Sequence, residues 1–234
     1  MQVLVIHVRG NEDRRLFIEK QLSGPGMPVE YILDGNKEDL TDEVLDKYFA
    51  GEMYGQFPNT SCAYKHLLSC RYIVEHDLEG ALVVEDDLRI FKGFKQKFEE
   101  SMEECRREHA DEPLIINYEE SSLLLVPRSQ RRKGKMLYKA ERDRFAGCMY
   151  VSRRAAEAIM EYVEKHKSEH TSDRLHTLLI QKGLLTYYWS YPCLACQCSC
   201  DGSMPTMIPT RPRPYKRLKW FYKRFYKHLL YWFR

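Results

Sequence analysis

The chain has 234 residues, of which 44% are hydrophobic and 30% charged. That length can bury the core of one compact α/β domain, and the composition excludes a largely disordered protein. The formal net charge of +3 is uneven, because residues 211–234 hold nine Lys or Arg and no Asp or Glu. Residues 1–210 therefore carry about −6, so the body lacks the basic surface that is typical of a nucleic-acid-binding domain.

Neither a targeting signal nor a membrane span is evident in the sequence. The start, MQVLVIHVRG, lacks the basic-then-apolar layout of a signal peptide. No stretch reaches the ~18 uninterrupted apolar residues that a membrane span needs. We therefore expect a cytoplasmic or peripheral protein whose eight cysteines are reduced thiols.

Hydrophobic spacing predicts alternating strands and helices through the first half of the chain. Apolar and β-branched runs predict strands at 2–8, 29–33 and 80–84. Helical periodicity predicts helices at 12–22, 41–49, 61–76 and 94–107. Asn11 is expected to cap the helix at 12–22. Leu16, Ile18 and Leu22 would supply most of the apolar face of that helix.

The second half continues the alternation and ends in a separate tail. Strands are predicted at 113–117, 145–151 and 184–191, and helices at 153–165 and 173–181. A hairpin of 122–126 with 135–139 would surround a basic loop at 130–134. This order predicts an α/β fold with a largely parallel sheet. The linker prolines, Pro205, Pro209, Pro212 and Pro214, divide a domain at 1–204 from a tail at 205–234.

Three consecutive carboxylates, Glu85, Asp86 and Asp87, directly follow the predicted strand 80–84. Their mutual repulsion requires a cation or solvent to relieve it. Ligands of open α/β sheets bind outside the carboxyl ends of the strands, and carboxylate oxygens suit Mg²⁺ or Mn²⁺. The triplet therefore indicates a metal site, with a solvated acidic turn as the alternative.

Several short segments surround the triplet in a fixed order. The strand Val5–Val8 is followed by Arg14 and Arg15, and ALVVEDDL at 81–88 is preceded by the helical segment 61–66, SCAYKH. Later come YVSRRAA at 150–156, Asp173, and YPCLACQ at 191–197. Over residues 3–200 this arrangement resembles glycosyltransferase family 25, the lipopolysaccharide-type galactosyltransferases. The chain departs from the family at three positions, where His7, Ser61 and Lys65 replace the usual Asn, Gly and Ser.

The resemblance implies a GT-A-like nucleotide-sugar-binding fold and metal-assisted transfer with inversion, most simply from UDP-galactose. It implies Mn²⁺ or Mg²⁺ on Asp87 with Glu85 or Asp86, and Asp173 as the general base. Asp173 is equally suited to cap a helix that starts at Arg174. Donor contacts are implied for Arg14, Arg15, Asp34, His66 and Asp86. A solvated helix start, a plain turn and a buried helix histidine are the alternatives for Arg14 and Arg15, Asp34 and His66, respectively.

Two further features lie near the C-terminus. The run Cys193, Cys196, Cys198 and Cys200 has the residue types of a zinc site, but its tight spacing favours small apolar fillers. On a helix, the tail would place lysines on one side and, on another, Leu218, Phe221, Phe225, Leu229 and Trp232. This pattern favours an anionic membrane surface over packing on the same domain or on a second subunit, and no nucleic-acid motif accompanies it.

Together these features predict a peripheral enzyme on the cytoplasmic face of the inner membrane. It would transfer a hexose from a UDP-sugar to lipopolysaccharide or another surface glycan. One alternative is a non-catalytic relative that keeps the fold and binds a glycan or a protein partner. The other is a module that acts through its tail alone.

Overall fold

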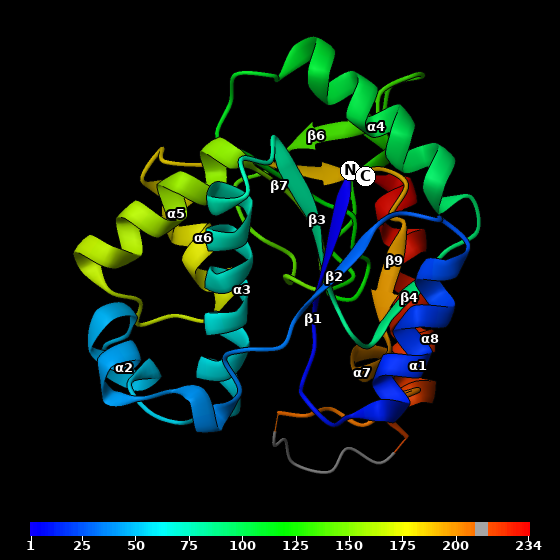
Figure 1. Ribbon diagram of the computed structural model, residues 1–234. Helices are drawn as coiled ribbons and strands as arrows, with labels where there is room; N and C mark the ends of the chain where they lie inside the picture. The colour runs from blue at the N-terminus through cyan, green and yellow to red at the C-terminus, as the bar shows by residue number, and fades with distance from the viewer. Residues whose placement is uncertain (209–214) are drawn as a thin grey trace.

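The computed structural model describes residues 1–208 and 215–234. Its centre is a seven-stranded sheet in the order β2-β1-β3-β7-β5-β8-β6 (Figure 1). Five strands share one direction, and β6 and β7 run against them. The strands are β1 (Gln2–Ile6), β2 (Val29–Ile32), β3 (Gly80–Glu85), β5 (Leu114–Asn117), β6 (Leu137–Lys139), β7 (Cys148–Ser152) and β8 (Thr186–Ser190).

Helices cover both faces of this sheet (Figure 1). One layer contains α2 (Asp42–Tyr48), α3 (Pro58–Glu75), α5 (Arg153–His166) and α6 (Ser172–Gln181). The other contains α1 (Glu12–Ser23) and α4 (Phe94–Glu108), with the last helix, α8 (Lys216–Phe233), on the same side. Short elements complete the chain: the 3-10 turns Lys37–Asp39, Gly51–Met53 and Arg128–Gln130, the helix α7 (Cys198–Asp201), and a ribbon of β4 (Leu88–Ile90) with β9 (Ala195–Gln197).

Alternation along the central strands builds two separate cores. In β1, Val3 and Val5 pack toward α1 and α4, whereas Leu4 and Ile6 pack toward α3 and α5. Side chains of successive strand residues point to opposite faces, so a strand covered on both sides must be apolar throughout. The α/β prediction and its predominantly one-directional sheet are confirmed.

Two local predictions are wrong. Leu16 is 64% exposed, and the buried positions of α1 are Arg14, Ile18 and Leu22. The predicted hairpin does not form either, because β6 pairs with β8 and residues 122–126 form no strand. The buried Arg144 donates to the carbonyl of Leu124, so this segment satisfies part of its backbone through a side chain.

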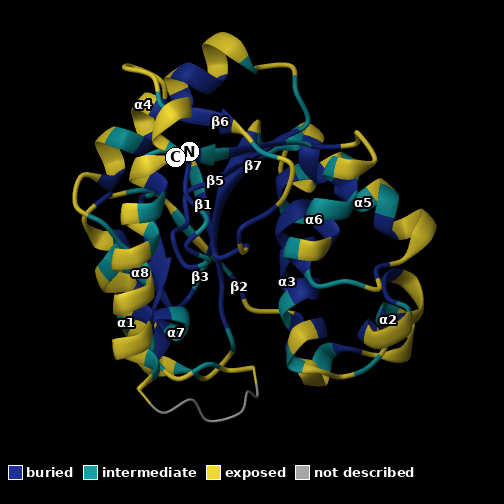
Figure 2. Cartoon of the chain, turned by 180° about the vertical axis from the view of Figure 1, so that it is seen from behind, coloured by how far each residue is buried: buried dark blue, intermediate teal, exposed yellow. Residues whose placement is uncertain are grey.

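The last helix packs on the body of its own chain. Trp220 lies against Leu123 and Cys196, and Arg224 and His228 both pair with the buried carboxylate of Glu120. The opposite side stays exposed (Figure 2), including five predicted apolar residues, Leu218, Phe221, Phe225, Leu229 and Trp232. In the described residues, no helix combines the length and the apolar character required to cross a membrane. Of the linker prolines, Pro209, Pro212 and Pro214 lie outside the described residues.

Candidate functional site

The register of the sheet brings the acidic triplet beside the end of β1. Strands β1 and β3 are parallel, and Ile6 is paired with Glu85. The next residues of the two strands, His7 and Asp86, are therefore neighbours. The Nδ1 atom of His7 lies 2.9 Å from Oδ2 of Asp86, and both side chains are buried.

Asp86 is held on its second oxygen by Arg14. The guanidinium donates to Oδ1 of Asp86 at 2.6 Å and to the carbonyl of Pro205 at 2.8 Å. Asn11 caps α1 by accepting from the backbone N–H of Arg14, so the cap and the ion pair fix the same turn. Both carboxylate oxygens of Asp86 therefore have side-chain partners within the protein, His7 and Arg14.

Asp87 has the opposite character, since only one of its carboxylate oxygens is satisfied. Oδ2 accepts from the backbone N–H of Ser199 at 3.0 Å. Oδ1 is buried and has no hydrogen-bond partner within residues 1–208 and 215–234. Burial, and then the charge of Glu85, raise the pKa of Asp87 to about 6 against the lowering effects of Ser199 and Arg14.

Glu85 lies between α3 and the β4–β9 ribbon. Its Oε2 accepts from Nε2 of Gln197 at 2.7 Å. This contact depends on Gly147, where a Cβ would lie 2.6 Å from the Gln197 side chain. The other oxygen, Oε1, lies 3.9 Å from Sγ of Cys62 and 3.6 Å from Nε2 of His66.

The triplet opens into a cavity of about 530 Å³. Its wall includes Arg14 and His66, the start of α6 with Asp173, and Phe145, which has a φ of 85°. Residues 206–208, from the predicted linker, also line it. The cavity is therefore lined by the edge of the sheet, by helices of both layers and by the first residues of the tail.

Asp173 lies in the first turn of α6, which begins at Ser172, so the cap position belongs to Thr171. The alternative of Asp173 as the N-cap of a helix starting at Arg174 is thus wrong. The hydroxyl of Thr171 donates to Oδ1 of Asp173 at 2.6 Å. The carboxylate is half-buried and faces the same cavity as Asp87.

Two predicted donor contacts do not line this cavity. Arg15 is exposed and bonds Glu19 through Nε at 3.2 Å. The Asp34 carboxylate is 86% exposed and pairs with Arg9. Lys65 instead closes this turn, donating to the carbonyls of Leu33 and Asp34 at 2.9 and 2.8 Å; burial lowers the pKa of Lys65 to about 8.

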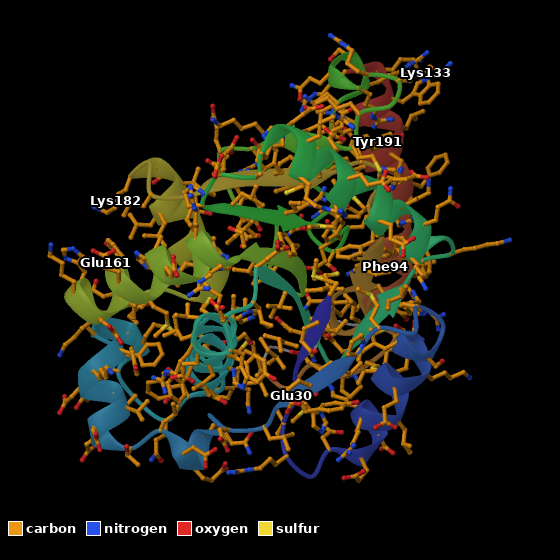
Figure 3. All side chains as sticks on the ribbon, turned by 45° about the horizontal axis from the view of Figure 1, so that its top comes forward. Glu30, Phe94, Lys133, Glu161, Lys182 and Tyr191 are labelled. Atoms are coloured by element: carbon orange, nitrogen blue, oxygen red, sulfur yellow. The ribbon has the colours of Figure 1, made fainter. Side chains whose placement is uncertain are left out.

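Neither the cysteine run 193–200 nor the basic loop 130–134 takes the role considered for it from the sequence. Among the described residues, the metal-ligating side chains that converge are Cys62, His66 and Glu85, and none of them belongs to the run 193–200. Lys133 lies in the loop beside α8, at the same end of the molecule as Tyr191 (Figure 3). The neighbouring Arg131 donates to the Tyr191 hydroxyl, and no residue of 130–134 lines the cavity.

Four residues at or near the site, His7, Lys65, Gln197 and Ser199, had no predicted role. The signal for His7 was its place one residue beyond a strand, at the level of the triplet once β1 and β3 pair in parallel. Ser199 and Gln197 arrive through the short β4–β9 ribbon, whose three-residue strands leave little periodicity to detect.

A cavity at the carboxyl ends of the strands of an open α/β sheet is the usual ligand-binding position in α/β proteins. Residues 1–176 match glycosyltransferase family 25, described as a lipopolysaccharide (LPS) biosynthesis protein family, and the chain belongs to that family. The predicted resemblance is therefore confirmed.

No curated protein is significantly similar to this chain. Among solved structures, it is similar to a putative glucose-1-phosphate thymidylyltransferase from Bacillus anthracis in complex with a sucrose. That similarity covers 80% of this chain and 68% of the other, with 13% identity and a TM-score of 0.38. A likeness this distant assigns no chemistry to the present chain.

Proposed function

We propose that this protein is a metal-dependent, inverting glycosyltransferase with a GT-A-like donor site. It transfers galactose from UDP-galactose to LPS or another surface glycan. Family membership supports the transferase class and the LPS setting. The observation that carries the proposal is the buried Asp87, whose unpartnered oxygen lies beside a cavity that also contains Asp173.

The carboxylate oxygens of the triplet are of the type that binds a hard divalent cation. Asp87 offers an oxygen that no described residue satisfies, and its raised pKa reports uncompensated negative charge. Glu85 supplies a second carboxylate, while Asp86 is already bound by His7 and Arg14. Asp87 and Glu85 would therefore hold Mn²⁺ or Mg²⁺, which when bound offsets the charge of a leaving diphosphate.

Residues around these carboxylates would bind the rest of the donor. Arg14 lines the cavity, and its guanidinium is suited to phosphate oxygens. His66 lines the same wall with two ring nitrogens free of described partners. Roles for Arg15 and Asp34 at the nucleotide remain predictions, since neither side chain lines the cavity.

Asp173 is the proposed general base. Inversion requires a group that takes the proton of the acceptor hydroxyl on the side opposite the leaving group. Asp173 comes from α6, and the metal ligands come from the end of β3, so the acceptor and the donor phosphates can lie between them. Thr171 fixes one carboxylate oxygen, which leaves the other to accept the proton.

We further propose that the tail, 205–234, holds the domain of residues 1–204 at the cytoplasmic face of the inner membrane. Trp220 and Arg224 occupy the packed side of α8. The exposed side carries aromatic residues such as Phe225 and is flanked by lysines such as Lys223. Aromatic groups at the interface and lysines at anionic headgroups are the features of a peripheral helix.

Thermal unfolding with UDP, UDP-galactose or UDP-glucose, each with and without Mn²⁺, tests the donor site. A ligand that binds only the folded state raises its apparent stability. We expect a rise in Tm that requires nucleotide and metal together and is largest for UDP-galactose. A well-folded sample without any such rise would favour the non-catalytic, glycan- or partner-binding relative.

A further inference from the structure

Three side chains of different chemistry, a thiol, an imidazole and a carboxylate, lie together on the wall of the cavity. Cys62 and His66 are four residues apart on α3, so they lie one above the other on the same helix face. Glu85 is the last residue of β3. The ligand atoms of all three lie within 4.8 Å of one another.

The separations are close to the edges of a tetrahedral zinc site. Zinc bonds of about 2.0 Å to N or O and about 2.3 Å to S imply N–O and S–O edges of about 3.3 and 3.5 Å. The corresponding distances here are 3.6 Å from His66 to Glu85 and 3.9 Å from Cys62 to Glu85. Side-chain movements of a few tenths of an ångström would close them around one ion.

His66 is the member of the cluster whose polar atoms have no hydrogen-bond partner among the described residues. It is 4% exposed, and within the described chain both ring nitrogens are buried without a hydrogen-bond partner. Burial of a polar group without a hydrogen-bond partner is unfavourable, so a ligand on His66 would stabilise the fold. Nε2 lies beside the carboxylate of Glu85, at a distance longer than a hydrogen bond.

The surroundings favour a cation and leave it accessible. The carboxylates of Glu85, Asp87 and Asp173 line the same cavity as Cys62 and His66, so the site lies in a region of negative charge. The same negative field attracts a cation. All three side chains line the cavity, so a bound ion would keep an open coordination position toward it.

We propose that Cys62, His66 and Glu85 form a binding site for Zn²⁺, separate in donor chemistry from the hard-cation site at Asp87. Thiolate and imidazole ligands select Zn²⁺ over Mg²⁺ and Mn²⁺. Binding forms the S–Zn bond and releases the thiol proton of Cys62 to solvent. Because Glu85 belongs to both donor sets, Zn²⁺ would also compete with the metal that supports transfer; this consequence rests on the proposed function.

Zinc binding to the purified full-length protein, measured by competition with a chromophoric chelator, tests the site without any sugar donor. We expect one tight Zn²⁺ per chain in the wild type and at least tenfold weaker binding in Cys62→Ser and in His66→Asn. Substitution by Co²⁺ should add a thiolate-to-metal charge-transfer absorption that Cys62→Ser abolishes.

Cys200→Ser is the matched control, because Cys200 lines the same cavity but does not belong to the cluster. It should bind Zn²⁺ like the wild type. Unchanged zinc affinity in Cys62→Ser and His66→Asn overturns the proposal. So does loss of binding in Cys200→Ser alone, which would place the ion in the run 193–200. Neither outcome depends on whether the protein transfers a sugar.

Discussion

Asp87→Asn should raise the stability of the metal-free protein while abolishing metal-supported transfer. The substitution removes a charge that is 1% exposed, lies beside Glu85 and has one unpartnered oxygen. It keeps the size of the side chain and an oxygen for the Ser199 backbone N–H. The gain in stability and the loss of transfer have one cause. The uncompensated charge of Asp87 would bind the metal, and when no metal is bound the same charge destabilises the fold.

The magnitude follows from the pKa of Asp87, which rises from 3.8 to about 6. A folded-state pKa above the unfolded value stabilises the fold at acidic pH. That contribution is complete below about pH 4 and is lost as pH rises through about 6. The loss is at most about 3 kcal/mol at neutral pH. Allowing for a weaker bond to Ser199, we expect the variant to gain about 1–3 kcal/mol, a rise in Tm of about 2–12 °C.

Thermal unfolding in chelator, from pH 4 to pH 8, measures this difference. The stability of the wild type relative to Asp87→Asn should fall across pH 4–6 and level off above it, and added Mn²⁺ should stabilise only the wild type. Asp86→Asn is the contrasting variant, because it leaves Arg14 and His7 without their carboxylate and should lower stability by about 3–5 kcal/mol. Equal stability of Asp87→Asn and wild type at neutral pH, with full Mn²⁺-dependent turnover, would refute the reasoning.

Three other perturbations test separate parts of the molecule. Asp173→Asn should lower kcat by about 10²–10⁴-fold in steady-state assays and leave the UDP-dependent rise in Tm unchanged. The double variant Lys219→Glu, Lys223→Glu should lose at least about 1 kcal/mol of binding free energy per substituted residue in sedimentation with anionic vesicles at low salt. If the wild type bound neutral vesicles as well as anionic ones, a charge-dependent surface would be contradicted. Phe145 has a φ of 85°, which glycine adopts more easily than alanine, so Phe145→Gly should be more stable than Phe145→Ala by about 1 kcal/mol in thermal unfolding. The reverse order would show that the backbone at this position is not strained.

Much of the fold was predictable because its central elements carry strong local signals. Apolar β-branched runs identified β1 and β3, and helical periodicity identified α3 and α5. The β4–β9 ribbon was missed because its strands are three residues long. The false hairpin at 122–126 had the composition of a strand, but its backbone is satisfied in part by Arg144, which is distant in sequence.

Residues that directly follow a strand could be placed from the sequence, because the direction of the strand determines which edge of the sheet they occupy. Contacts that depend on where a side chain points could not be predicted. Placing the triplet at the end of a buried strand put Asp87 at the carboxyl edge of the sheet, where the cavity lies. The adjacent arginines were indistinguishable in the sequence. Only the rotation of α1 shows that Arg14 points inward to Asp86, whereas Arg15 points to solvent and Glu19.

The three consecutive carboxylates differ in how the protein compensates their charge, and this difference is the basis of the roles proposed for them. Asp86 has two cationic or hydrogen-bonding partners and behaves as an anchor for the end of β1 and the start of α1. Glu85 has an amide on one oxygen and a thiol and imidazole near the other. Asp87 keeps one oxygen without a described partner, although it is the most buried of the three. The contrast between a fully partnered Asp86 and a buried, partly unpartnered Asp87 supports the proposed metal at Asp87, because burial of an uncompensated charge is unfavourable.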